Sequence, residues 1–491
     1  MRTSPILLKD GYKVGHKFQY PEGTILVYSN LTPRKSRNAE VDEIVFFGLQ
    51  YFIKEYLIRQ FDELFFKRPQ AEVLQQYARI MDNYLGKDSI SYQHIADLHK
   101  LGYLPLEIKA LPEGSLVPMR VPVFTIKNTV PEFFWLTNML ETLLSAILWK
   151  PCTSATTAFQ YLKTFTKYAE ETVGNDMGFI PWQGHDFSFR GMSGIEDAAM
   201  SGAAHLLSFA GTDTIPAIDF LETYYHADCE KELVGGSVPA TEHSVMCMGT
   251  QDDEIKTFER LINDIYPAGI VSIVSDTWDF WKVITVFLPQ LKDKILARNG
   301  KVVIRPDSGD PVKIIIGDKD APIGSPEYKG AIECMWETFG GTITEMGYKL
   351  LDSHIGLIYG DSITTERQVA ILEGLKEKDF SSYNVVLGIG SFTYEYVTRD
   401  TFGFAMKATY GEVNGEGRDI FKDPKTDDGT KKSAKGLMQV YRDNATGKLT
   451  LKDQCTWAEE EQGELKTVFK DGALLVDVTL AEIRNRIKEL I

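Results

Sequence analysis

The sequence predicts an α/β fold built around a barrel of parallel strands, and three observations support this prediction. Four apolar runs in the second half of the chain are rich in β-branched residues and continuous, as in strands buried on both faces of a sheet. Each run ends in a charged or glycine-rich cluster. Each is then followed by a helix-like stretch or a polar insert. The four runs are IVSIVSD (270–276), KVVIRPDSG (301–309), HIGLIYGDS (354–362) and NVVLGIGS (384–391).

Three earlier segments repeat the pattern of strand, polar tip and helix: HDFSFRG (185–191), LLSFAGTD (206–213) and GSVPATEHS (236–244). About seven βα units are therefore expected over residues 151–394. Within them, TQDDEIKTFERLINDIY (250–266) has the apolar face of a helix, and residues 318–330 have the composition of an inserted surface loop. The carboxyl ends of barrel strands form one face, which would bring together Asp276, Arg305, Asp307, Gly360, Asp361 and Gly390.

The two ends of the chain depart from this repeat. Residues 1–150 mix the short strands TILVYSN and EIVFFGL with amphipathic helices such as QYFIKEYLIRQF and PEFFWLTNMLETLLSAILW, which indicates a separate α+β domain or half of one. From residue 395 the chain becomes basic and rich in glycine, continues as short strands and closes with the amphipathic helix LAEIRNRIKELI. The basic segment 410–436 is expected to act as a lid over a polyanion.

Composition excludes several classes of protein. A chain of 491 residues suggests two or three domains with a large core. Its net charge of −16 argues against sequence-independent binding to nucleic acid or to an anionic membrane. The five cysteines form no C-x-x-C pair, and no apolar run approaches the roughly 18 residues of a membrane span. We therefore expect a cytoplasmic enzyme that holds any phosphate ligand with local Arg and Lys side chains.

The acidic strand ends are suited to a magnesium ion. Asp276, Asp307 and Asp361 beside Arg305 can hold Mg²⁺ on a phosphorylated substrate, because magnesium prefers oxygen ligands and is commonly shared with substrate phosphates. A ring of internal salt bridges is the alternative, since buried charges are costly unless they are paired. The sequences GDS and GIGS can present backbone N–H groups to a phosphate, although tight turns also use such glycines.

Basic residues are unusually dense after the last strand: Arg399, Lys407, Lys422, Lys431 and Lys435. In so acidic a chain they suggest a grip on a polyanion, and a solvated charged face is the alternative.

The earlier strand ends suggest a flat heteroaromatic ligand. Phe187 offers a stacking face, Arg190 a planar set of donors and Asp213 an acceptor for an N–H₂ group, although Phe187 alone also fits a core position. His243 lies at another strand end beside Glu242, where histidine is often functional. The chain contains no G-x-S-x-G, H-E-x-x-H or Walker A sequence, which leaves hydrolase, metalloprotease and P-loop functions without support.

In several of these segments the chain resembles the nicotinamide phosphoribosyltransferase family. The matching segments run in order over nearly the whole chain: DGYKVGHKFQYP (10–21), FFGLQY (46–51), HDFSFRG, GTDT (211–214), VPATEHS, SDTWD (275–279), IRPDSG (304–309), GDS, TRD (398–400) and FKDP (421–424). The resemblance implies a type II phosphoribosyltransferase, with an incomplete α/β barrel (151–394) and an α+β domain built from 1–150 and 395–491. It also implies a head-to-tail homodimer whose two active sites lie at the interface. The reaction joins nicotinamide and 5-phosphoribosyl 1-pyrophosphate, with Mg²⁺, in NAD salvage.

The same resemblance implies a role for each site residue. Phe187 would stack on the pyridine ring opposite Tyr12 of the partner subunit, Asp213 would accept from the carboxamide, and Arg190 would donate to the carboxamide oxygen or to the ribosyl phosphate. His243 matches a histidine that ATP phosphorylates, so that ATP is a coupled substrate. The ribose, phosphates and Mg²⁺ would be held by Asp10, Arg34, Ser272, Asp276, Arg305, Asp307, Gly360, Asp361, Gly390, Ser391, Arg399, Lys407, Lys422 and Lys431, with Asp307 and Asp361 on the metal.

The chain also departs from the family pattern, at Gly11, Gln183, Ser391 and Ala405. These departures bear on affinities and not on the reaction. Two other functions stay open. Nicotinate phosphoribosyltransferases share the fold and the chemistry, but a ligand carboxylate facing Asp213 would be repelled at close range. The second open function is that of a binding or signalling protein built on an inactive barrel. The charged strand ends argue against it, because a protein that needs only a binding surface does not require charged residues there.

Overall fold

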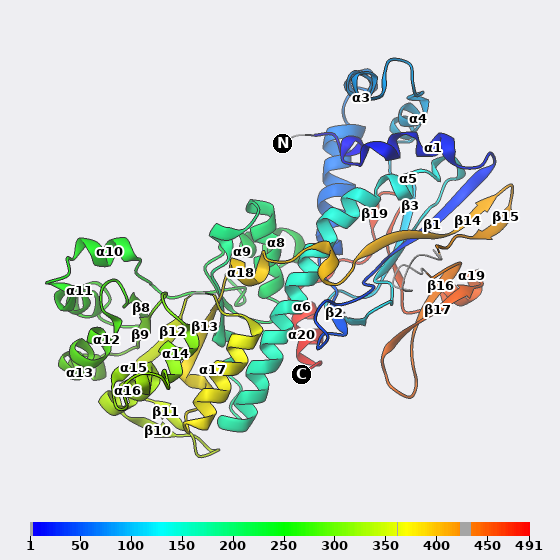
Figure 1. The fold of residues 1–491 in the computed structure, drawn as a ribbon. Helices are drawn as coiled ribbons and strands as arrows, with labels where there is room; N and C mark the ends of the chain where they lie inside the picture. The colour runs from blue at the N-terminus through cyan, green and yellow to red at the C-terminus, as the bar shows by residue number, and fades with distance from the viewer. Residues whose placement is uncertain (1–2, 361, 423–433) are drawn as a thin grey trace. The chain divides into compact units, whose positions relative to one another are not determined.

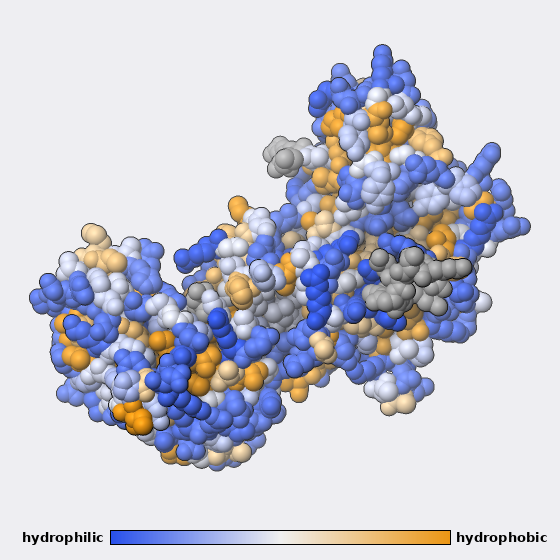
Figure 2. Space-filling view, in the orientation of Figure 1, coloured by the Kyte–Doolittle hydropathy of each residue, from blue (hydrophilic) through white to orange (hydrophobic). Residues whose placement is uncertain are grey.

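The computed structural model describes residues 3–360, 362–422 and 434–491. They form two compact units, which we treat separately: unit 1 comprises Met1–Thr156, Leu221–Ala227 and Val397–Leu490, and unit 2 comprises Thr157–Phe220, Asp228–Tyr396 and Ile491. Hydrophilic side chains predominate on the face drawn in Figure 2. None of the helices in the described ranges combines the length and the apolarity that a membrane crossing needs.

Unit 2 contains a curled sheet of six parallel strands in the order β7-β6-β13-β12-β9-β8 (Figure 1). The strands are β6 (Gly184–Asp186), β7 (Gly211–Thr212), β8 (Val271–Val274), β9 (Val302–Arg305), β12 (Ile355–Tyr359) and β13 (Val385–Ile389). Residues 236–240 lie between β7 and β8, where they make two isolated parallel bridges, Gly211 to Gly236 and Ala240 to Ser272. This segment occupies the place of a seventh strand. The predicted incomplete barrel of about seven parallel strands is confirmed.

The register of the central strands explains why the polar strand ends meet. Strand β12 pairs with both neighbours in parallel, so that Leu357 lies beside Ile304 of β9 and beside Val385 of β13. These three side chains are buried, as the continuous apolar runs predicted. Because all the strands point the same way, the residues that follow them converge on one edge of the sheet.

Helices and short turns connect the strands of unit 2. The helices are α7 (Ile180–Gln183), α8 (Ile195–His205), α9 (Pro216–Tyr225), α10 (His243–Met248), α11 (Glu254–Arg260), α12 (Phe280–Lys282), α13 (Leu288–Leu296), α14 (Pro311–Ile316), α15 (Pro326–Lys329), α16 (Ala331–Phe339), α17 (Thr365–Glu377) and α18 (Ser391–Tyr394). The helix expected over 250–266 begins at Glu254, and its second half, η7 (Leu261–Ile265), has the wider π-helical turn.

The insert expected as a loop at 318–330 contains one helical turn. Helix α15 begins there because the Ser325 side chain accepts from the backbone N–H of Tyr328 and because Pro326 occupies the first helical position. Farther along, β10 (Gly341–Ile343) and β11 (Lys349–Leu351) form an antiparallel hairpin.

Unit 1 is organised around a seven-stranded antiparallel sheet in the order β15-β14-β1-β5-β3-β18-β19. Its strands come from both ends of the chain: β1 (Thr24–Thr32), β3 (Leu106–Ala110), β5 (Phe124–Asn128), β14 (Ala405–Val413), β15 (Glu416–Asp419), β18 (Lys466–Lys470) and β19 (Ala473–Leu474). Two small sheets accompany it, β2 (Glu43–Val45) with β4 (Leu116–Pro118) and β16 (Leu437–Arg442) with β17 (Leu449–Cys455).

The helices of unit 1 include α1 (His16–Gln19), α2 (Leu49–Phe52), η3 (Ile53–Gln60), α3 (Gln70–Leu85), α4 (Gln93–Leu101), α5 (Leu136–Met139), α19 (Trp457–Glu461) and α20 (Leu480–Lys488). The long helix α6 (Glu141–Thr172) begins in unit 1, and its residues from Thr157 onward belong to unit 2. The basic segment 410–436 contains the end of β14 and the whole of β15. Its residues 423–433, with Lys431, lie outside the described part of the chain.

Candidate active site

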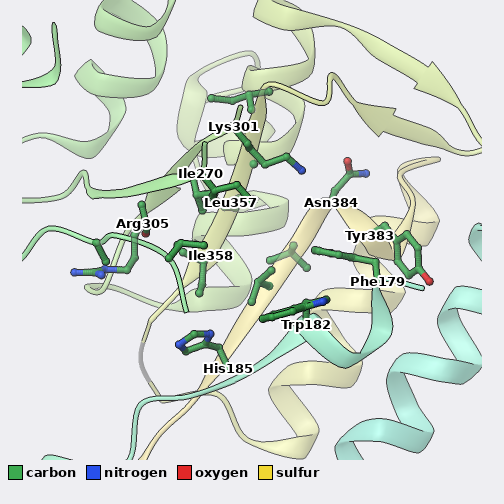
Figure 3. Close-up of a pocket in the computed structure, with 18 of the residues that line it drawn as sticks. Phe179, Trp182, His185, Ile270, Lys301, Arg305, Leu357, Ile358, Tyr383 and Asn384 are labelled. Atoms are coloured by element: carbon green, nitrogen blue, oxygen red, sulfur yellow. The ribbon is translucent and has the colours of Figure 1, made fainter. Parts of the chain in front are cut away.

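A cavity of about 470 Å³ lies on the inner face of the unit 2 sheet. At one end it is lined by residues at or beyond the carboxyl ends of strands, such as Asp213 and Arg305, and at the other by residues that precede strands, such as Lys301 and Asn384. Figure 3 shows Phe179, Trp182 and Tyr383 on one side of this cavity, with His185 and Lys301 far apart along it. The aromatic lining residues are Phe179, Trp182, Phe187 and Tyr383. Its size is in the range of small-molecule sites.

Asp213 is oriented by two protein donors that use the same carboxylate oxygen. His185 Nε2 lies 2.9 Å from Oδ1, and Ser237 Oγ donates to Oδ1 at 2.7 Å. Because a carboxylate only accepts, His185 carries its proton on Nε2. Burial raises the pKa of Asp213, but the hydrogen bond and charge of His185, then Ser237 and Arg305, hold it below its ordinary value. Neither of these two contacts uses Oδ2, so this ionised oxygen can accept from a ligand in the cavity.

Phe187 and Ser272 supply a ring face and a hydroxyl to the same cavity. The ring of Phe187 lies against that of His185, with centroids 4.5 Å apart, and it is accommodated by Gly388, where an added Cβ would lie 2.7 Å from Phe187 Cδ2. Ser272 Oγ is buried and has no hydrogen-bond partner among the described residues. A buried hydroxyl without a partner is costly, and a polar ligand group or a water can satisfy it.

Arg190 is exposed and is not among the residues that line the cavity. It belongs to the turn η6 (Phe189–Gly191), which packs on the loop after β13, because a Cβ at Gly191 would lie 2.1 Å from Ser391 Oγ. Gly390 precedes helix α18, and the first N–H groups of a helix have no partner within it. Arg190, Gly390 and Ser391 therefore form one group, which favours the phosphate over the carboxamide as the partner of Arg190.

Asp276 binds its own protein on both oxygens. Oδ2 accepts from the backbone N–H of Asp307 at 2.9 Å, from the N–H of Ser308 at 2.8 Å and from Ser308 Oγ at 2.6 Å. Oδ1 lies 3.2 Å from Nε2 of the half-exposed His243. Burial raises the pKa of Asp276, but the bonds from Ser308, Asp307 and His243 lower it below the ordinary value. This saturated carboxylate positions the loop after β9 and is unsuited to bind a metal.

Asp307 lies in a space that glycine provides. Its Oδ1 is 3.4 Å from Arg305 Nε, and a Cβ at Gly360 would lie 2.2 Å from the same oxygen. The Gly360 N–H donates to the Pro306 carbonyl at 3.3 Å. This N–H was expected to bind phosphate, but here it is already used by a hydrogen bond within the protein. Asp361 lies outside the described residues, and among the rest no group of three or more His, Cys, Asp or Glu side chains is arranged to hold a metal. The ion pair between Arg305 and Asp307 belongs to the ring of internal salt bridges that the sequence left open as the alternative to a magnesium site.

Unit 1 gathers four of the predicted phosphate ligands. The pKa of Lys407 is lowered by partial desolvation and by the positive charges of Arg34, Lys422 and Arg399, while Glu141 raises it. Arg34 is held by its Nε bond to the Gly403 carbonyl at 3.1 Å. A cluster of like charges is unfavourable in the absence of an anion, which indicates an anion site.

The remaining predicted residues of unit 1 lie near its amino terminus. Tyr12 is 64% exposed, and Lys13 Nζ lies 5.1 Å from the centre of its ring. The Asp10 carboxylate accepts from Thr142 Oγ1 at 2.7 Å, which places this loop on helix α6. The exposed ring of Tyr12 can take part in stacking.

Sequence analysis missed His185 and Ser237 as site residues. The signal for His185 was present, because it lies two residues before Phe187 in an extended segment and such residues share one face. Ser237 gave no comparable signal, since its role depends on the irregular segment 236–240 and on Asp213, which is distant in sequence.

Comparisons with known proteins identify the family of this chain. The model of the nicotinate phosphoribosyltransferase family matches residues 182–473, and that of the nicotinamide phosphoribosyltransferase N-terminal domain matches residues 4–108. A nicotinamide phosphoribosyltransferase of Acinetobacter baylyi is 57% identical over 499 residues, which cover 99% of this chain and 98% of that protein. One from Xanthomonas campestris is 33% identical, over 98% of this chain and 97% of that protein.

Solved structures show the same fold at low identity. A nicotinate-nucleotide pyrophosphorylase from Pyrococcus furiosus has a TM-score of 0.62 at 15% identity, over 99% of this chain and 95% of that chain. Human nicotinic acid phosphoribosyltransferase has a TM-score of 0.54 at 14% identity, over 98% and 93%. From its full-length identity to named relatives, we conclude that this chain belongs to the nicotinamide phosphoribosyltransferase family.

Proposed function

We propose that this protein joins nicotinamide to 5-phosphoribosyl 1-pyrophosphate, giving nicotinamide mononucleotide and pyrophosphate, as a step of NAD salvage. The observation that carries the proposal is the arrangement at Asp213, whose Oδ1 holds His185 and Ser237. Its other oxygen is then the acceptor for a carboxamide N–H₂. The names of the relatives at 57% and 33% identity support the same substrate.

The charge of Asp213 is the reason to prefer nicotinamide over nicotinate. Two like unit charges about 4 Å apart repel by roughly 4 kcal/mol at an effective dielectric constant of about 20. Because the pKa of Asp213 is lowered, its carboxylate is ionised at neutral pH and would repel a nicotinate carboxylate. A neutral carboxamide donates a hydrogen bond to it instead. Nicotinate phosphoribosyl transfer stays the alternative function.

The chemistry needs positioning and charge more than proton transfer. The pyridine nitrogen is a neutral nucleophile with a lone pair, so no general base is required. The barrier lies in separating pyrophosphate from an anomeric carbon that becomes cationic. We assign Phe187 to the pyridine ring, with Tyr12 of the partner subunit on its other face, and Ser272 to the carboxamide or the ribose. Holding the ring nitrogen in line with the departing pyrophosphate supplies much of the rate enhancement.

Phosphate and metal binding complete the proposed site. Asp307 and Asp361 are assigned to Mg²⁺, which when bound neutralises charge on the pyrophosphate. Asp307 fits this role because its carboxylate is partly exposed and because Gly360 leaves space beside it. Arg190, Gly390 and Ser391 are assigned to the 5-phosphate. The basic cluster is assigned to the pyrophosphate or to ATP phosphates: Arg34, Arg399, Lys407, Lys422 and Lys431.

We further propose a homodimer in which unit 1 of one subunit completes the site of the other. Tyr12 and the basic cluster belong to unit 1, whereas Phe187 and Asp213 belong to unit 2. The family resemblance supports the proposal that these groups meet in one site shared between two subunits.

His243 is proposed to accept a phosphoryl group from ATP and so to couple ATP hydrolysis to nucleotide formation. Its Nε2 donates to Asp276, which leaves Nδ1 with the lone pair that a nucleophile needs.

A steady-state assay tests the proposal. Purified protein is supplied with phosphoribosyl pyrophosphate, Mg²⁺ and either nicotinamide or nicotinate, and each mononucleotide is separated and quantified. We expect the nicotinamide product, with kcat/KM for nicotinamide at least tenfold higher than for nicotinate. Preferential use of nicotinate would select the alternative function, and no turnover of either base would reject both.

A further inference from the structure

The buried hydroxyl of Tyr161 lies behind two loops of the candidate site. Tyr161 is on helix α6 and is fully buried. Its Oη donates to the Ile363 carbonyl at 2.8 Å and lies 3.2 Å from Thr393 Oγ1. Ile363 follows Gly360 by three residues in the loop after β12, and Thr393 follows Gly390 by three residues in the short helix α18, which comes after β13.

Thr393 closes this contact into a triangle. Its hydroxyl lies 3.0 Å from the same Ile363 carbonyl, and its backbone N–H donates to the Gly390 carbonyl at 3.1 Å. Among the described residues, the hydroxyls of Tyr161 and Thr393 are the two donors that reach the Ile363 carbonyl. A carbonyl oxygen has two lone pairs, so the two donors satisfy it together. Burial raises the pKa of Tyr161, which keeps its hydroxyl protonated as a donor at working pH.

Two local contacts hold the backbone next to the triangle. Ser362 has a positive φ of 55°, a conformation that non-glycine residues seldom adopt, and its carbonyl accepts from Arg367 Nη1 at 2.6 Å. Beyond Gly390, the N–H of Tyr394 also donates to the Gly390 carbonyl, at 3.2 Å. Each of these contacts lies within one segment, whereas the triangle joins the two segments.

We propose that Tyr161 is a positioning residue that fixes the loop after β12 relative to the segment after β13 that carries Gly390 and Ser391, and thereby sets the affinity for the 5-phosphate of the ribosyl substrate. The inference rests on the proposed function, which assigns Gly390 and Ser391, after β13, to the 5-phosphate and the neighbouring loop after β12 to Mg²⁺. Backbone N–H groups bind an anion well only when they are held in the correct directions beforehand. Loss of the triangle lets the loops move separately, so the N–H directions are no longer fixed.

The affinity for the 5-phosphate should fall slightly when one hydroxyl is removed and strongly when both are removed. In Tyr161→Phe the Ile363 carbonyl keeps its bond from Thr393, and in Thr393→Val it keeps the bond from Tyr161. Each single variant should weaken 5-phosphate binding about fourfold. The double variant leaves a buried carbonyl without a donor, which costs more than the sum of the two single losses. Its affinity should fall by about fiftyfold or more.

Tyr168 offers a matched control. It lies seven residues farther along helix α6, is also buried, and donates from its hydroxyl to Glu373 Oε2 at 2.8 Å. Glu373 lies in helix α17, away from both loops. Tyr168→Phe therefore removes a hydrogen bond of the same kind from the same helix without touching the triangle.

The experiment measures two quantities for the wild type, Tyr161→Phe, Thr393→Val, the double variant, Thr393→Ser and Tyr168→Phe. The first is the dissociation constant of ribose 5-phosphate by calorimetry, which needs no turnover. The second is KM, which is determined separately for phosphoribosyl pyrophosphate and for nicotinamide. We expect the dissociation constant and the KM for phosphoribosyl pyrophosphate to rise together in the first three variants, while KM for nicotinamide stays within twofold. Thr393→Ser keeps the hydroxyl and should restore the wild-type values, and Tyr168→Phe should match them.

The outcomes separate this inference from the proposed function. Wild-type affinity for ribose 5-phosphate in the double variant would overturn the positioning role, as would an equal rise of both KM values or a loss in Tyr168→Phe of the same size. If Tyr161→Phe fails to fold, the comparison of Thr393→Val with Thr393→Ser decides in the same way. A wild-type protein that neither binds ribose 5-phosphate nor turns over would instead reject the proposed function.

Discussion

Asp276 and His243 form a pair in which one carboxylate connects the histidine to the loop after strand β9. Oδ1 lies 3.2 Å from His243 Nε2, while Oδ2 accepts the backbone N–H groups of Asp307 and Ser308. In the proposed coupling, Nδ1 of His243 carries the phosphoryl group while Asp276 holds the same imidazole ring through Nε2. Because the same carboxylate holds the loop that carries Asp307, this pair would connect the proposed phosphohistidine to the proposed ribosyl site.

His243→Ala is expected to separate the reaction from its ATP dependence. Without an imidazole nitrogen no phosphohistidine forms, so ATP hydrolysis and the stimulation of product formation by ATP should both disappear. Nicotinamide mononucleotide formation without ATP should stay measurable. The two activities are measured with and without ATP on the same preparation. Stimulation by ATP that persists in His243→Ala would show that another residue carries the phosphoryl group.

Mixed dimers test the shared active site. Arg399→Ala and Asp307→Ala homodimers carry one lesion in every proposed site and should both be nearly inactive. In a mixed dimer both lesions fall in one site and the other site is intact. With half of the dimers mixed after co-expression, about a quarter of wild-type activity should return. If mixed dimers are shown to form and activity stays at the level of the parents, each chain's basic cluster serves its own barrel.

Gly360→Ala is expected to displace Asp307. The added Cβ would lie 2.2 Å from Asp307 Oδ1, well inside van der Waals contact, so the carboxylate must move. KM for phosphoribosyl pyrophosphate and the Mg²⁺ concentration for half-maximal rate should each rise about tenfold, with nicotinamide binding unchanged. A titration of rate against Mg²⁺ measures the effect. Unchanged magnesium dependence in the folded variant would remove Asp307 from the metal site.

Glu254 is expected to make stability depend on pH. This carboxyl is buried, its Oε1 has no hydrogen-bond partner in the described ranges, and burial raises its pKa to about 7, with Lys282 lowering the pKa and Asp279 raising it. Since the folded state then holds a proton that the unfolded state has lost, stability falls as pH rises from about 4.5 to about 7, and levels off above that.

Glu254→Gln removes this titration. Between pH 5 and pH 7.5 the wild type should lose stability that Glu254→Gln keeps. The melting temperature of the variant should therefore rise relative to that of the wild type, by an amount that corresponds to about 2 kcal/mol in the free energy of unfolding. Glu259→Gln serves as the control, because Glu259 lies on the same helix as Glu254 but is partly exposed and is paired with Lys294. A difference that does not change with pH would show that Glu254 is hydrated in solution.

The sequence predicted the barrel well because continuous apolar runs and polar strand ends are local signals. Strand β9, which ends at Arg305, and Asp307 just beyond it lie where the run KVVIRPDSG placed them. The helical turn at Pro326 could have been found, since Ser followed by Pro is a helix start signal.

The finer geometry of the site depends on contacts between distant segments. The saturation of Asp276 arises from a loop about 30 residues away in sequence, and the engagement of the Gly360 amide arises from Pro306. Neither contact has a local sequence pattern. The same is true of Ser237 at Asp213, which is why residue types alone predicted Asp213 as an acceptor but not which of its oxygens is engaged by the protein.

The most direct test of the account is the ratio of kcat/KM for nicotinamide to kcat/KM for nicotinate, measured for the wild type, Asp213→Asn and Asp213→Ser. Asparagine keeps the shape of the side chain and removes its charge, whereas serine removes both the charge and the reach. We predict that kcat/KM for nicotinamide falls in both variants by a factor that corresponds to roughly 2 kcal/mol or more, and that the ratio shifts toward nicotinate. A ratio that stays at the wild-type value in both folded variants would contradict the assignment of Asp213 as the acceptor that selects the amide.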